Sequence, residues 1–163
     1  MNKYTIGLLV RNRYGVLSRI SSLFSRRGFN IDSLTVGETE DSSVSRMTIT
    51  LTGTSHDRDQ TIKQLAKLHD VIVVEDMSSN KSVTRELVII KVKADKNSRQ
   101  DIMSAANVFR AKVVDYSTSS MMLEITGAED KINAFVEIIK DYGLLEIART
   151  GIVAVNRGAK NID

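Results

Sequence analysis

A chain of 163 residues with a formal net charge of +3 can hold one domain or two small ones, and its 42% hydrophobic content is enough to bury a core. It contains no cysteine, which excludes disulfides, thiolate nucleophiles and cysteine-bound zinc. No apolar run is long enough to span a bilayer, and the first residues alternate like a strand with no signal-peptide pattern, so we expect a cytoplasmic protein.

The first half of the chain predicts the element order β-α-β-β-α-β from the spacing of its apolar residues. Strand-like alternation gives way to helical spacing at Val16, and Gly28 stands where a glycine commonly ends a helix. The predicted elements are a strand at 4–10, a helix from 16, strands at 31–38 and 44–52, a helix at 57–69 and a strand at 71–74.

The polar stretch MSSNKSVTRE, residues 77–86, has no apolar periodicity and is the best linker candidate. After it the same element order begins again. The predicted elements are a strand at 87–93, a helix around 102–109, strands at 113–114 and 121–125, a helix around 132–139, and a final strand at 144–148 and 152–155 that is broken at Gly151.

Two repeats of one pattern predict an α+β fold, specifically an α/β sandwich built from two ferredoxin-like βαββαβ domains. Each domain is expected to have an antiparallel sheet with two helices on one face. The predicted boundaries are residues 1–78 for the first domain, 79–86 for the linker and 87–163 for the second domain. Such sheets leave edge strands with unpaired backbone groups, so we expect a homodimer that pairs them.

The usual signals of catalysis are missing from the sequence. There is no phosphate-binding G-x-x-x-x-G-K-[ST] motif and no G-x-S-x-G motif. The two histidines, His56 and His69, are not spaced as a metal pair. Glu38, Glu40 and Asp41 cluster in a predicted hairpin turn, which is more typical of a solvated turn than of an acid–base pair. We therefore expect no active site of the chain's own.

The loop that joins the first strand to the first helix is the strongest candidate for binding. Residues 1–31 carry six basic and no acidic side chains, a pattern that fits nucleic acid, an acidic protein, a small anion or simply a solvated helix face. A helix start presents free backbone N–H groups and partial positive charge to a carboxylate or phosphate. Gly15 would let a ligand approach the backbone, and Asn12 offers a donor and an acceptor, although both residues could instead only shape the turn.

Three segments resemble the small regulatory subunit of acetolactate synthase, also called acetohydroxyacid synthase. They are NRYGVLSRISSLFSRRGFNIDSLTV at residues 12–36, SRMT at residues 45–48 and EIARTGIVAVNRG at residues 146–158. The resemblance covers essentially the whole chain. It implies that the first domain is an ACT domain, a module that senses small molecules, and that the second is the family's C-terminal domain.

The resemblance also implies the partners. The partner would be a large catalytic subunit that holds thiamine diphosphate, magnesium and FAD, with no cofactor in this chain. The effector would be valine or another branched-chain amino acid, with no nucleic-acid or membrane partner. In such a homodimer the effector would lie between two ACT domains. The residues that the resemblance places there are Asn12, Gly15, Val16 and Leu17 from one chain and Asn30, Ile31 and Val36 from the other.

Two other functions stay open from the residues. A free-standing amino-acid-sensing regulator of transcription would fit the basic first half, but both halves are used by β-α-β-β-α-β patterns and leave no helix-turn-helix. An independent enzyme would need a catalytic constellation that the sequence does not contain.

Overall fold

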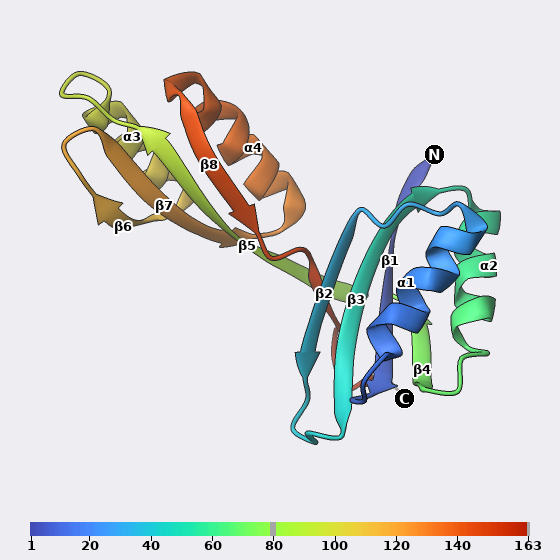
Figure 1. Ribbon diagram of the computed structural model, residues 1–163. Helices are drawn as coiled ribbons and strands as arrows, with labels where there is room; N and C mark the ends of the chain where they lie inside the picture. Colours follow the sequence, from blue (N-terminus) through green and yellow to red (C-terminus); the bar gives the residue numbers. More distant parts are fainter. Residues whose placement is uncertain (79–80, 163) are drawn as a thin grey trace. The chain divides into compact units, whose positions relative to one another are not determined.

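The computed structural model describes residues 1–78 and 81–162 and divides into two compact units (Figure 1). The first unit is formed by Met1–Val83 together with Ile152–Asp163, and the second by Thr84–Gly151. Residues 79–80 of the predicted linker, and the last residue, lie outside the described residues. Within the described residues no helix is long and apolar enough to cross a membrane.

The first unit has the predicted βαββαβ order, and its sheet order of β2-β3-β1-β4 is that of a ferredoxin-like fold. All three strand pairs are antiparallel. Its elements are β1 (Asn2–Arg11), α1 (Val16–Arg27), β2 (Ser33–Glu38), β3 (Val44–Gly53), α2 (Ser55–Leu65) and β4 (Val71–Asp76). Helix α2 begins two residues before its predicted start because Thr54 and Asp57 form a reciprocal capping box.

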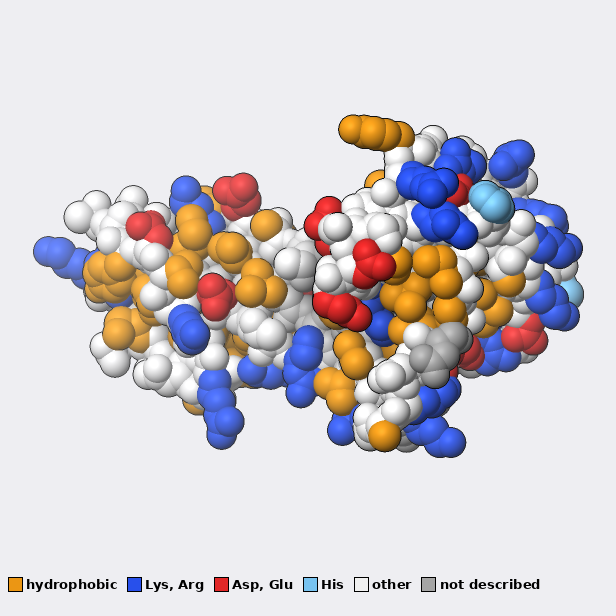
Figure 2. Space-filling view, turned by 90° about the horizontal axis from the view of Figure 1, so that it is seen from below, with side chains coloured by type: hydrophobic (Ala, Val, Ile, Leu, Met, Phe, Trp, Pro, Cys, Tyr) orange, Lys and Arg blue, Asp and Glu red, His pale blue; other side chains and the backbone are white. Residues whose placement is uncertain are grey.

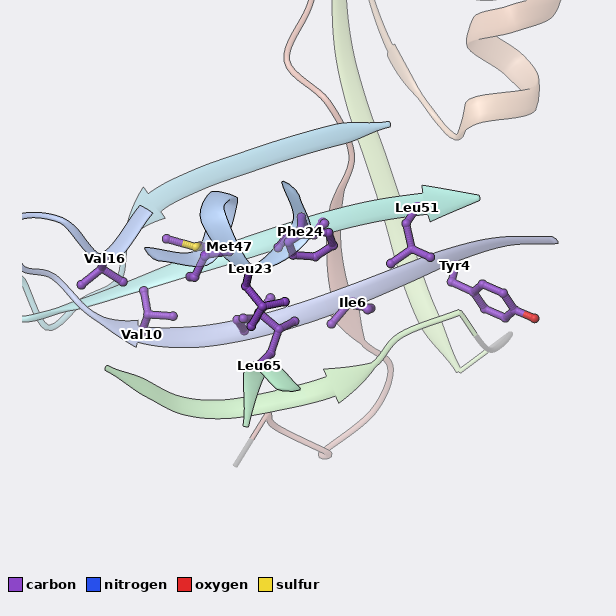
Figure 3. Close-up of a cluster of buried hydrophobic side chains, with 12 residues drawn as sticks. Tyr4, Ile6, Val10, Val16, Leu23, Phe24, Met47, Leu51 and Leu65 are labelled. Carbon is purple, nitrogen blue, oxygen red and sulfur yellow. The ribbon is translucent and has the colours of Figure 1, made fainter. Parts of the chain in front are cut away.

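The core of the first unit lies between the sheet and its two helices (Figure 3). Alternate residues of β1 and β3 point to the same face, so Ile6 and Val10 meet Met47 and its neighbours there. Phe24 of α1 is almost fully buried against them. Each such side chain contributes roughly 1.5–3 kcal/mol when fully buried.

The second unit repeats this architecture with sheet order β6-β7-β5-β8, so the predicted fold class is confirmed for both halves. Glu86 is buried and accepts two hydrogen bonds from the Arg149 guanidinium, at 3.0 and 2.6 Å, which joins β5 to β8. The elements are β5 (Ser82–Lys93), α3 (Arg99–Phe109), β6 (Lys112–Tyr116), β7 (Ser120–Gly127), α4 (Glu129–Ile139), a 3-10 turn η1 (Lys140–Tyr142) and β8 (Leu144–Arg149).

The structure differs from the sequence-based domain and linker boundaries at two places. Strand β5 begins at Ser82, so residues 82–86 are strand and not linker. The end of the chain forms a separate strand, β9 (Val153–Asn156), which pairs with β5, and the segment from Ile152 onward groups with the first unit although the sequence pattern placed it in the second domain. Gly151, at φ 85°, lies between β8 and β9, in a left-handed conformation that a glycine adopts without strain.

Residues 152–162, which we call the tail, are held on the sheet of the first unit. Ala154 donates its N–H to Thr48 Oγ1 at 3.4 Å, and its carbonyl accepts a 2.8 Å hydrogen bond from Arg46 Nη2. Asn156 Nδ2 donates to Glu75 at 2.8 Å, and Lys160 pairs with the same carboxylate. In Figure 1 the red tail passes behind the sheet, on the side away from α1 and α2. The tail therefore adds a layer to the first unit's second face.

Gly7 is central to the packing of this added layer. A Cβ at residue 7 would lie 2.4 Å from Met77 Sδ and 3.3 Å from Ile162 Cδ1, and both of these side chains are buried. Only a residue without a side chain therefore lets Met77 and the tail close over β1.

We expect Gly7→Ala to lower the free energy of unfolding by about 1–3 kcal/mol, because Met77 and Ile162 must move out of a packed layer. Gly37→Ala is the matched control, since a Cβ there meets no atom within 4 Å. The free energy of unfolding of the wild type and of both variants is measured by urea denaturation at the same protein concentration. Equal stability of the two variants would contradict the packing role of the tail.

Candidate ligand-binding site at the start of α1

The loop between β1 and α1 is held by backbone hydrogen bonds on both sides. Arg11 donates its N–H to the carbonyl of Asp70 at 2.8 Å, next to β4. Asn12 donates its N–H to the carbonyl of Ser43 at 2.7 Å, in the hairpin that joins β2 to β3. These bonds fix the path of the chain just before the helix begins.

Helix α1 begins without a side-chain cap, and the N–H of its first residue, Val16, donates to the carbonyl of Arg13 at 3.4 Å. Its N-cap is Gly15, at φ 81°, and no side chain makes a capping hydrogen bond. Of the four α-helices in residues 1–78 and 81–162, α1 alone has no acidic residue in its first turn. Uncapped N–H groups and the helix dipole together favour an anion at this position.

The side chain of Asn12 is oriented by the hairpin. Its Nδ2 donates to Glu38 Oε1 at 3.0 Å and to the carbonyl of Ser42 at 2.9 Å. An amide nitrogen has two hydrogens, so both are used, and Oδ1 is left as the acceptor of Asn12. The sequence singles out Asn12 but not its partners, because Glu38 lies 26 residues further along the chain and the pattern there indicates only a solvated turn.

Charged groups around the loop are partly paired. Arg19 Nη2 lies 2.5 Å from Asp70 Oδ2, which neutralises the acid next to α1. In the hairpin, Asp41 accepts hydrogen bonds from the hydroxyl and the N–H of Ser43, at 2.7 and 2.9 Å, and these lower the pKa of the Asp41 carboxyl. Figure 2 shows Lys and Arg side chains along the margin of the first unit (right in the view) with acidic side chains on the same face, so this face does not carry charge of one sign.

Four of the predicted site residues lie near one another because they belong to the loop and the first turn of α1. They are Asn12, Gly15, Val16 and Leu17. Val16 is buried in the core, whereas Leu17 is 44% exposed. Val36 lies on β2 opposite Met47 and is 43% exposed, two residues before the Glu38 that binds Asn12.

Asn30 and Ile31 lie elsewhere within one chain. They follow the C-terminal end of α1, a 12-residue helix that spans about 18 Å, so they are far from the loop at its N-terminal end. Asn30 is exposed and donates to Asp32 at 3.3 Å, and Ile31 packs partly buried against the core. A single chain therefore does not assemble all seven predicted residues.

Within residues 1–78 and 81–162, no group of three or more His, Cys, Asp or Glu side chains is placed to hold a metal ion. The chemistry that the described site offers is recognition of a small ligand. Its N–H groups suit a carboxylate, and its amide oxygen suits a donor.

Comparisons with known proteins cover almost the whole chain. A family model described as the AHAS small subunit-like ACT domain matches residues 6–73, and one described as the small subunit of acetolactate synthase matches residues 85–158. An acetolactate synthase small subunit from Mycolicibacterium smegmatis is 48% identical over 159 residues, which cover 98% of this chain and 94% of the relative. A probable acetolactate synthase small subunit from Archaeoglobus fulgidus is 49% identical over 158 residues, covering 97% and 99%.

A solved structure agrees with these sequence matches. The crystal structure of an acetolactate synthase small subunit from Thermotoga maritima superposes with a TM-score of 0.90 at 39% identity, covering 98% of this chain and 100% of that one. The likeness therefore extends over both units.

The hairpin that holds Asn12 gives a pH-dependent prediction. The pKa of folded Asp41 is lowered from 3.8, so its contribution to stability is complete above that value and is lost as the pH falls through the folded pKa. We expect an NMR titration of the Asp41 carboxyl carbon to have its midpoint below 3.8. Ser43→Ala should move the midpoint up, because the hydroxyl hydrogen bond is the largest cause of the shift. Ser42→Ala is the control, and equal midpoints in the two variants would contradict this origin.

Proposed function

The chain belongs to the family of acetolactate synthase small subunits, and from this premise we propose that it binds the large catalytic subunit, raises its activity and makes it sensitive to valine or another branched-chain amino acid. The large subunit would carry out the reaction in valine, leucine and isoleucine synthesis with thiamine diphosphate, magnesium and FAD. A cytoplasmic location stays a prediction. The observation that carries the proposed sensing role is the uncapped start of α1 beside the free oxygen of Asn12.

A free amino acid matches this arrangement group by group. Its carboxylate would accept hydrogen bonds from the first N–H groups of α1, where the helix dipole favours negative charge. Its ammonium would donate to Asn12 Oδ1, since both Nδ2 hydrogens are already used. The exposed side chains of Leu17 and Val36 offer apolar surface to a branched side chain.

We further propose that the site is completed by a second copy of the chain. Strand β2 is an edge of the sheet, and pairing it antiparallel with the partner's β2 would satisfy its free backbone groups. In such a pair the start of one β2 lies beside the end of the other, which would bring the partner subunit's Asn30 and the partner subunit's Ile31 towards Glu38 and Asn12. This arrangement accounts for the separation of the seven residues within one chain.

Replacing Val36 tests the dimer. Val36→Lys should shift the protein from dimer to monomer, because it places a charge on the proposed β2 interface. Ile72→Lys is the matched control, because Ile72 is 50% exposed on β4, the opposite edge of the same sheet. Light scattering at micromolar concentration measures the mass of both variants. A wild-type monomer, or dissociation caused only by Ile72→Lys, would contradict the proposal.

Replacing Gly15 tests the effector site. Gly15→Asp should abolish inhibition by valine while the large subunit is still activated, since the new carboxylate takes the place of the effector's carboxylate. A tenfold loss of affinity corresponds to about 1.4 kcal/mol, and allosteric coupling is typically only about 1–3 kcal/mol. Gly158→Asp is the control for backbone strain, because Gly158 also has a positive φ and a Cβ there would meet no atom within 4 Å, whereas one at Gly15 would lie 3.2 Å from Arg19 Nη1.

The assay is acetolactate formation by the large subunit reconstituted with each variant across a valine titration. Asn12→Ala should weaken inhibition less than Gly15→Asp, because it removes hydrogen bonds without adding an obstruction. An unchanged inhibition curve for Gly15→Asp would place the effector elsewhere. A wild-type chain that neither activates the large subunit nor responds to valine, leucine or isoleucine would contradict the proposed function as a whole.

A further inference from the structure

Glu38 is joined directly to the candidate site, although it was not among the predicted site residues. Its Oε1 accepts the 3.0 Å hydrogen bond from Asn12 Nδ2, and its side chain is exposed at the end of β2. One carboxylate oxygen can accept more than one hydrogen bond, and the second oxygen adds further acceptor positions. Glu38 therefore keeps acceptor capacity next to the amide that orients the loop.

Two other acids near this loop are engaged elsewhere. Asp70 is paired with Arg19 at 2.5 Å. Asp41 accepts two hydrogen bonds from Ser43 within its own turn. Among the described residues, Glu38 is thus the carboxylate that is hydrogen-bonded to the side chain of Asn12.

The residues that flank Asn12 in the loop are positive. Arg11 and Arg13 flank Asn12 in the sequence, and the start of α1 adds the partial positive charge of the helix dipole. These groups attract a carboxylate but repel an ammonium group. In an α-amino acid both groups are bonded to the same carbon atom, so a ligand whose carboxylate lies on the helix start must keep its ammonium close to the loop.

We propose that Glu38 determines the specificity of this site, because its carboxylate compensates the positive loop and selects ligands with an α-ammonium group over 2-oxo acids with the same side chain. The proposal rests on the proposed function, since it takes the ligand to lie at the start of α1. In this arrangement Asn12 Oδ1 and Glu38 receive the ammonium together, while the helix N–H groups hold the carboxylate that both ligand classes share.

The test uses the full-length protein and two probes, valine and 3-methyl-2-oxobutanoate, which have the same branched side chain and carboxylate. Glu38→Gln is the informative variant, because the glutamine amide oxygen still accepts from Asn12 while the charge is removed. Isothermal titration calorimetry should find that Glu38→Gln weakens valine binding at least about tenfold, the size expected for a hydrogen bond to a charged group, and does not weaken binding of the oxo acid. Glu40→Gln, an equal charge change in the same hairpin, should leave both affinities unchanged.

The outcomes separate this inference from the proposed function. An unchanged ratio of the two affinities in Glu38→Gln, whether both are retained or both fall equally, overturns the specificity role and leaves the site itself in place. Two results would overturn both proposals: wild-type protein that binds neither probe, and a Gly15→Asp variant that binds valine as tightly as the wild type. Either result would mean that the ligand does not bind at the start of α1.

Discussion

Two backbone hydrogen bonds at the end of β1 set the geometry on which the candidate site depends. The N–H of Arg11 is bonded to the carbonyl of Asp70 on one side, and the N–H of Asn12 to the carbonyl of Ser43 on the other. The end of β1 therefore cannot move independently of the two segments beside it. The loop is short, and its side chain at Asn12 is oriented by Glu38 and Ser42. A ligand bound here would meet loop groups that are already held in place, so ordering them would cost little conformational entropy.

The same topological position in the second unit is chemically different. Helix α3 also follows the unit's first strand, but Asp95 accepts hydrogen bonds from the N–H groups of Asn97 and Ser98, both at 2.8 Å. These bonds lower the pKa of Asp95, with the bond from the Ser98 backbone as the largest cause. The second unit thus has a hydrogen-bonded carboxylate just before its first helix, where the first unit has Gly15. The repeat in the chain is one of topology, and the polar groups at this position differ between its two copies.

Periodicity predicted both βαββαβ units because each helix and strand buries one face against its immediate neighbours in the sequence. It did not predict the start of β5, because this part of β5 pairs with β9, which lies in the tail about seventy residues further along the chain. Asn12 and Gly15 could be singled out because a strand–loop–helix junction is local. Glu38 could not, since its role depends on a hairpin folding back onto that loop.

The position of the tail makes the second unit an insertion within the first. Both ends of Thr84–Gly151 are covalently joined to segments that belong to the other unit. Residues 152–162 leave the ribosome after the whole of the second unit, so the sheet of the first unit stays open on its second face while the second unit emerges and can fold. Arg46, Thr48 and Glu75 therefore acquire their partners in the tail only after the second unit has been synthesised. A chain that terminates early would therefore leave its first half, and not only its missing end, incompletely covered.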